Sequence, residues 1–118
     1  MVKFGSEPFL ECSSKGDSRF SAFSARFKTG KSIEELYQAS KVFEDGSTGL
    51  TWREAKGKKA INQTECRVLY SYLWDLYFKE NPHLYGVIKQ YKGFSDIFGQ
   101  QGRACQAEEI YRIYNEVR

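Results

Sequence analysis

The chain has 118 residues, of which 41% are hydrophobic and 16% aromatic, and it carries a formal net charge of +3. This length fits one domain and leaves no room for a second. The aromatic content provides enough apolar surface for a core, so the composition excludes an intrinsically disordered chain. The balance of 18 basic against 15 acidic residues permits an anionic ligand but does not require nucleic acid.

Cysteine and histidine are too few and too scattered for several kinds of site. Cys12, Cys66 and Cys105 form no CxxC or Cys/His cluster, which argues against a disulfide framework and against structural zinc. His83 is the only histidine and is expected at the surface, so a histidine-based triad is largely excluded.

The start of the chain lacks the apolar run of a signal peptide, and no stretch approaches the roughly 18 apolar residues of a membrane span. We therefore expect a cytoplasmic protein that does not enter a membrane.

The N-terminal half contains short elements and turns. Residues 1–11 hold apolar pieces typical of an edge strand, and the spacing of three phenylalanines over residues 20–27 predicts an irregular strand. Ser32 begins a helix with a capping box, in which its hydroxyl and the Glu35 carboxylate satisfy exposed N–H groups reciprocally. This helix is expected to end at residues 44–46. The Gly- and Lys-rich residues 47–62 then form a long loop, of a length that is usually functional.

The C-terminal half is mostly helical. Thr64 caps the strongest helix, about residues 65–80, whose apolar residues recur at three- and four-residue intervals. Pro82 begins another helix, residues 99–102 form a glycine-bounded loop, and a final helix starts at about Arg103. Any sheet therefore comes mostly from the N-terminal part and is short and irregular. The predicted fold is a small single α+β domain over residues 1–118.

Three segments carry candidate chemistry. Glu34, Gln38 and Lys41 stand at i, i+4 and i+7, so a helix places them on one stripe that can hold a sugar and stabilise a cationic transition state. Residues 52–59 combine a tryptophan with several cations, which suits a base and a phosphate. Residues 96–103 form a loop entering a helix, which can present N–H groups to an anion. Taken one at a time, all three are more often an ordinary solvated surface.

In combination the motifs resemble one family. Residues 32–41, SIEELYQASK, resemble the hallmark of the NADAR (NAD- and ADP-ribose-associated) family, in which a Ser or Thr, an aliphatic residue and a Glu precede Tyr-Gln-Ala and a Lys. Residues 19–23 are similar to its segment ending in Leu-Ser-Asn-Phe, and residues 55–58 to its Ala-Lys followed by Gly-Arg. Residues 77–82 resemble its long helix running into Lys-Phe and Asn-Pro, and residues 96–99 its Asp followed shortly by Trp-Gly. The order is consistent over most of the chain, and the first block is the specific part.

The resemblance implies an α+β N-glycosidase that hydrolyses the N-glycosidic bond of a ribosylated nucleotide or of an ADP-ribosylated base in nucleic acid, without a cofactor or metal. Breaking the C1′–N bond builds positive charge on the ribose, so a fixed carboxylate near C1′ lowers the barrier. By position in the motif, Glu34 is the catalytic carboxylate, and Asp96 is a second acid or a ribose ligand. From the resemblance and the three segments, the residues expected to bind substrate are Tyr37, Gln38, Lys41, Trp52, Lys56, Phe98, Gly99 and Arg103.

Three positions depart from the family pattern. Ala22 stands where Asn is usual, Glu35 where His is frequent, and Phe98 where Trp precedes Gly. A shallow pocket that lost part of its stacking platform can bind without turning over, so a non-catalytic protein that binds and sequesters a nucleotide or ADP-ribose is an alternative. A small protein-interaction module is another, since most of the aromatic residues fall on core stripes. The sequence leaves open the leaving group and the oligomeric state.

Overall fold

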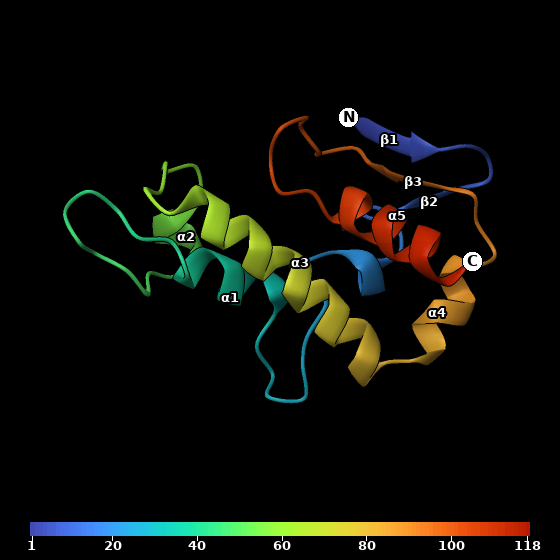
Figure 1. Cartoon of the computed structure of the whole chain (residues 1–118), viewed down its shortest axis with the longest axis horizontal. Helices are drawn as coiled ribbons and strands as arrows, with labels where there is room; N and C mark the ends of the chain where they lie inside the picture. The colour runs from blue at the N-terminus through green and yellow to red at the C-terminus, as the bar shows by residue number, and fades with distance from the viewer.

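The computed structural model describes residues 1–118 and shows five α-helices, a short 3-10 helix and one three-stranded sheet (Figure 1). This confirms the predicted α+β class. In chain order the elements are β1 (Val2–Gly5), β2 (Phe9–Glu11), η1 (Ser18–Phe20), α1 (Ile33–Ala39), α2 (Trp52–Ala55), α3 (Gln63–Glu80), α4 (His83–Ile88), β3 (Gly93–Asp96) and α5 (Gln106–Val117).

The long helix α3 runs across the molecule. α1 and α2 lie at one end of it, and the sheet, α4 and α5 lie at the other (Figure 1). The molecule is accordingly elongated, with extents of 45 × 29 × 24 Å. None of its helices combines the length and the apolar character needed to cross a membrane.

The sheet has the order β1-β3-β2, with β3 antiparallel to β1 and parallel to β2. Its two edge strands come from the N-terminal part, as predicted, but its central strand, residues 93–96, was missed. All four residues of β3 are buried, and only one of them, Phe94, is a strong strand former. Pairing on both sides and the cover of α5 produce this strand, so its local sequence does not reveal it.

The predicted irregular strand over residues 20–27 is wrong. The segment contains the end of η1, a series of turns and one isolated bridge between Arg26 and Ser32. The Asp17 carboxylate caps η1 by accepting the Arg19 backbone N–H at 3.1 Å, which favours the helical turn over an extended chain. The turns bury Phe20 in the core.

The start of α1 is confirmed. The Ser32 hydroxyl accepts the Glu35 N–H at 3.0 Å, and the Glu35 carboxylate accepts the Ser32 N–H at 3.2 Å. The helix ends at Ala39, earlier than predicted. The cause is Asn62, whose side chain donates to the Ser40 carbonyl and accepts the Val42 N–H, both at 2.9 Å, so that the chain turns away with its polar groups satisfied.

The later helices differ from prediction mainly at their ends. The expected loop over residues 47–62 contains the four-residue helix α2, which begins with its own capping box at Thr51. α3 starts at residue 63 after Asn62, so Thr64 does not cap it. α5 starts at residue 106, and Arg103 lies in the turn before it.

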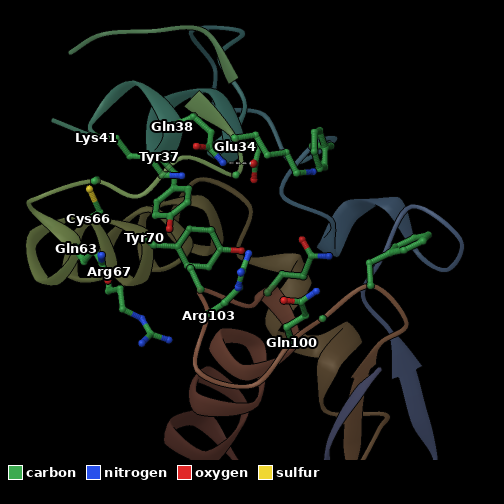
Figure 2. Close-up of a pocket in the computed structure, with 18 of the residues that line it drawn as sticks. Glu34, Tyr37, Gln38, Lys41, Gln63, Cys66, Arg67, Tyr70, Gln100 and Arg103 are labelled. Atoms are coloured by element: carbon green, nitrogen blue, oxygen red, sulfur yellow. Dashed lines mark hydrogen bonds between the residues drawn. The ribbon is translucent and has the colours of Figure 1, made fainter. Parts of the chain in front are cut away.

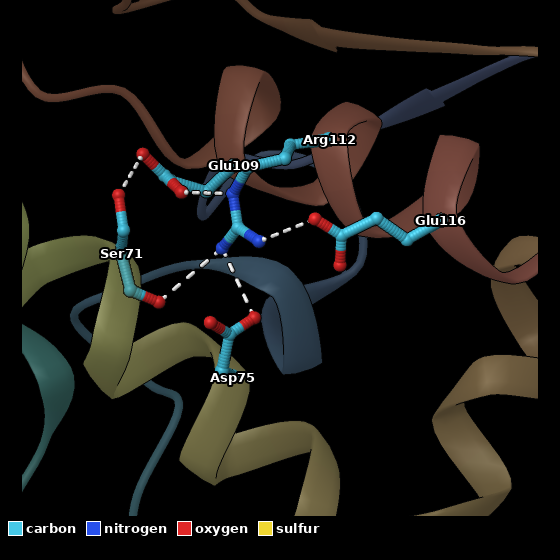
Figure 3. A network of polar contacts seen from close by, with 5 residues as sticks. All are labelled: Ser71, Asp75, Glu109, Arg112 and Glu116. Atoms are coloured by element: carbon cyan, nitrogen blue, oxygen red, sulfur yellow. Dashed lines mark hydrogen bonds and ion pairs between the residues drawn. The ribbon is translucent and has the colours of Figure 1, made fainter.

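One side chain joins α3 to α5. The Arg112 guanidinium donates to the carboxylates of Asp75, Glu109 and Glu116 at 3.0–3.2 Å and to the Ser71 carbonyl at 3.3 Å (Figure 3). The Ser71 hydroxyl in turn donates to Glu109 at 2.8 Å. Because α5 also packs on the sheet, this network fixes the sheet relative to α3.

Candidate functional site

A cleft of about 880 Å³ lies between α1 and the loop that follows β3 (Figure 2). This volume is in the range of small-molecule sites. Nine of the ten residues predicted from sequence line it: Glu34, Tyr37, Gln38, Lys41, Lys56, Asp96, Phe98, Gly99 and Arg103. Trp52 does not line it. The structure therefore brings together residues of the α1 segment and of the loop after β3, which are far apart in the chain.

Glu34 lies in the first turn of α1 and extends into the cleft (Figure 2). The residue is 8% exposed. One carboxylate oxygen accepts the Gln38 Nε2–H at 2.7 Å, one helical turn away, and no protein group hydrogen-bonds the other oxygen. Burial with one unpaired oxygen suits a carboxylate that meets a cationic centre or orients a water molecule.

Lys41 lies just beyond the end of α1, so its place on the Glu34–Gln38 stripe depends on the turn after the helix. Its ammonium lies 5.5 Å from the Tyr37 ring centroid and donates to the Ala55 carbonyl at 3.5 Å. Burial lowers the pKa of Lys41, and the nearby Glu34 carboxylate opposes that shift. No carboxylate lies within ion-pair distance of this amine, so it is available to an anion in the cleft.

Asp96 ends the central strand and enters the cleft from the opposite side. Its Oδ1 accepts the Phe98 N–H at 2.9 Å, and its Oδ2 accepts the Gln106 Nε2–H at 3.0 Å. Burial raises the pKa of Asp96, while these two hydrogen bonds oppose the rise. Residues 97–99 of the loop after β3 thus direct their N–H groups to protein acceptors and not into the cleft.

The two carboxylates are linked through Ala22. The Ala22 N–H donates to the Gln106 Oε1 at 2.7 Å, and the Ala22 carbonyl accepts the Glu34 N–H at 3.0 Å. Since Gln106 also binds Asp96, a continuous chain of hydrogen bonds runs from one carboxylate to the backbone of the other. These bonds fix the width of the cleft between α1 and β3.

Basic side chains dominate the charge of the cleft. Six of them line it against two carboxylates: Lys41, Lys56, Lys58, Lys59, Arg67 and Arg103. Arg103 extends toward Glu34 from the opposite side, beside Tyr70 (Figure 2). The predicted set did not include Arg67. The available signal was the spacing of Gln63, Arg67 and Tyr70, which places polar groups on one stripe of α3 next to its apolar face.

Two tyrosines form part of the wall. The rings of Tyr37 and Tyr70 pack edge to face with their centroids 4.9 Å apart, and both residues line the cleft. Burial raises the pKa of both hydroxyls, so they stay protonated and can donate hydrogen bonds to a ligand.

The aromatic ring in this wall of the cleft is not the one predicted to stack on a base. Trp52 packs edge to face on Phe23 with centroids 5.3 Å apart, and Phe23 is the ring that lines the cleft. The Lys56 ammonium lies 4.5 Å from the Phe23 ring centroid. Phe98, which is 62% exposed, also lines the cleft. Trp52 therefore supports the position of Phe23, a residue that the site prediction missed.

Two of the three positions that depart from the NADAR pattern have side chains outside the cleft. Ala22 belongs to the hydrophobic core and adds no side-chain group to the cleft. Glu35 caps its own helix and pairs with Arg26 at 3.1 Å, also outside the cleft. His83 is exposed on α4, as predicted. The cleft consequently contains no imidazole.

The cleft suits an organic anion. No cluster of three or more His, Cys, Asp and Glu side chains has an arrangement that could hold a metal ion. The cationic groups instead match phosphate, the tyrosine and phenylalanine rings match a planar base, and the two carboxylates match ribose hydroxyls or a developing positive charge. Comparison with known family models and with curated protein sequences gives no match. The NADAR resemblance therefore stays a prediction that rests on the motifs.

Proposed function

We propose that the protein is an N-glycosidase that hydrolyses the bond between ribose and base in a ribosylated nucleotide or an ADP-ribosylated base. The observation that carries the proposal is the Glu34 carboxylate, nearly buried in a strongly basic cleft and with one oxygen unpaired. A carboxylate in this setting stabilises an oxocarbenium-like ribose more strongly than it would in water.

The charge of the cleft supports a phosphorylated ligand. Phosphate groups bind the cations that line the cleft, Lys56 and Arg103 among them, and the ribose then lies between the two carboxylates. The rings of Phe23 and Phe98 provide faces for the base. A ligand of this kind uses both ends of the cleft at once.

The reaction consumes one water molecule. The C1′–N bond breaks and its electron pair stays on the leaving nitrogen, while the oxygen of water bonds to C1′. One proton of that water passes to Glu34 and then to the leaving nitrogen or to solvent. Asp96 already accepts three hydrogen bonds, one of them a long bond from the Cys105 thiol, so we assign it to holding a ribose hydroxyl. A base that already carries positive charge is then the favoured leaving group.

Binding without turnover is the second candidate, and one observation favours it. The cleft lacks an imidazole, and the positions where the family places Asn and His contribute no polar side chain to it. The same charges would then bind ADP-ribose and sequester it. An interaction module, by contrast, has no need of the six cations. For either ligand-binding role we propose a reducing compartment such as the cytoplasm, because Cys12, Cys66 and Cys105 are free and buried.

The test separates these roles. The protein is incubated with ADP-ribosylated guanosine and related N-ribosides, and released ADP-ribose or ribose phosphate is measured. Glu34→Gln should abolish release and retain binding of ADP-ribose by calorimetry. Glu35→Gln is the matched control, because it changes a neighbouring carboxylate outside the cleft and the glutamine oxygen can still accept the Ser32 N–H of the capping box. Turnover that survives Glu34→Gln removes Glu34 from its role. Binding without any release supports the sequestering role, and neither signal supports the interaction module.

A further inference from the structure

A second surface, on the outer face of α3, has no assigned role. The large exposed hydrophobic residues fall into two groups, apart from the N-terminal Met1. Phe23, Ile97 and Phe98 form one group, and two of these three line the cleft. The others, Ile61, Val68 and Tyr72, are 63%, 66% and 56% exposed and lie on or directly before α3.

Val68 and Tyr72 belong to one stripe of α3. Val68 and Tyr72 are four residues apart, and Glu65 and Lys79 continue the same helical face at three- and seven-residue spacings. This face is opposite to the one that carries Tyr70 and Trp74 into the core, and opposite to the cleft-lining side. An exposed apolar stripe on a helix whose other face already forms the core indicates a contact with another molecule.

The stripe is complementary to itself. Tyr72 lies seven residues after Glu65 and seven before Lys79, and both charged side chains are exposed. When a second α3 is laid antiparallel across a two-fold axis through Tyr72, Glu65 of each chain faces Lys79 of the other, roughly 10 Å along the helix from the axis. Val68 then faces the half-buried Leu76. Both oppositely charged pairs and the apolar contacts form in the same register.

The surface beside the stripe also has room for a partner. A shallow hollow lies there, lined by Thr64, Glu65, Val68, Leu69 and Tyr72. In the antiparallel register a side chain of the facing helix enters it. A contact confined to one pair of helices is small compared with the roughly 1,600 Å² of a standard interface, so the association is expected to be weak and dependent on concentration.

We propose that this face of α3 binds a second copy of the chain, giving a two-fold dimer with antiparallel α3 helices, Tyr72 at the axis and two reciprocal Glu65–Lys79 ion pairs. The cleft lies on the other side of α3 and stays open in this dimer. The proposal is therefore independent of the glycosidase activity, and either one can fail without the other.

Sedimentation equilibrium over a micromolar to millimolar range tests the dimer. The average mass should rise from the 13.7 kDa of one chain toward twice that value. Glu65→Lys or Lys79→Glu should raise the dissociation constant by roughly tenfold, because each change turns two attractive pairs into repulsive ones. The double reversal should restore association. Glu108→Lys, an equivalent charge change on the exposed surface of α5, is the control and should leave association unchanged.

A covalent test traps the dimer even when its association is weak. The three native cysteines are buried, so Tyr72→Cys introduces the one accessible thiol, and under mild oxidation it should form a disulfide with its own copy across the axis. Glu108→Cys should cross-link far more slowly. Thermal melts of each variant check that it is folded. A monomer at all concentrations, a dimer that ignores both charge reversals, or a failure of the double reversal to restore association overturns the proposal.

Discussion

Gln106 is the residue whose removal best tests how the cleft is held open. Its side-chain amide donates to Asp96 at 3.0 Å and accepts the Ala22 N–H at 2.7 Å. Gln106→Met keeps the length of the side chain and removes both hydrogen bonds. An unpaired buried N–H costs about 1–3 kcal/mol, and a lost bond to a carboxylate costs about 1.5–3 kcal/mol.

The two losses do not add in full. Gln106 lines the cleft, so water reaches the vacated positions and replaces part of each hydrogen bond. We therefore expect the free energy of unfolding to fall by about 2–3 kcal/mol, a large fraction of the roughly 5–15 kcal/mol of a typical domain. For a chain of this size the melting temperature should fall by about 8–12 °C.

The loss should also depend on pH. Burial raises the pKa of Asp96 above its value in the unfolded chain. The free energy of unfolding therefore falls as the pH rises through the folded pKa, because the folded protein then holds a buried, ionised carboxylate. Removing the Gln106 donor raises that pKa further, because the donor favours the charged form. The penalty of Gln106→Met should therefore be larger at pH 7 than at pH 4.

Urea unfolding at both pH values measures the effect. Gln101→Met is the control, since Gln101 is exposed and makes no side-chain hydrogen bond, and its change should stay within about 0.5 kcal/mol. A loss below about 0.5 kcal/mol for Gln106→Met, or a loss of equal size at both pH values, would refute the idea that this amide holds the two walls together.

Three further changes address the α1 cap, the basic cleft and the core thiols. Ser32→Ala removes the cap of α1 and should lower the free energy of unfolding by about 1 kcal/mol in urea titrations, whereas Thr29→Ala should have almost no effect. Lys56→Gln should weaken the binding of ADP-ribose by roughly threefold to tenfold in calorimetry, with a smaller effect at high salt, because the contact is electrostatic. Burial raises the pKa of the fully buried Cys12 thiol, so the folded protein should react with a thiol reagent far more slowly than the urea-unfolded chain, and rapid reaction of the native protein would contradict this packing.

The parts of the fold that follow from local pattern were predictable. The capping box at Ser32 defines where α1 begins, and the three- and four-residue spacing of apolar groups defines α3. The placement of Glu34 and Gln38 on one face follows from the same local geometry, and the structure puts both in the cleft. Helix ends were less predictable, because Asn62 stops α1 from a distance of more than twenty residues.

The remaining features depend on tertiary contacts. β3 has a single strong strand former and becomes a central strand because two edge strands and α5 surround it. Phe23 lines the cleft in place of the predicted Trp52, because α2 packs Trp52 against Phe23 instead of turning it toward the cleft. The Gln106–Ala22 hydrogen bond joins residues 84 positions apart, and no local pattern indicates such a pair.

The position of Ala22 separates the frame of the site from its contacts with a ligand. Its backbone makes both hydrogen bonds that join the two walls, and its methyl group lies in the core. The hydrogen bonds between the two walls therefore use only the backbone of this residue. The methyl group adds no polar contact to the cleft. The outcome of the glycosidase test therefore depends on how Glu34 and the basic groups meet the substrate. Product release by the unaltered protein decides between turnover and binding alone, and Glu34→Gln shows whether turnover depends on this carboxylate.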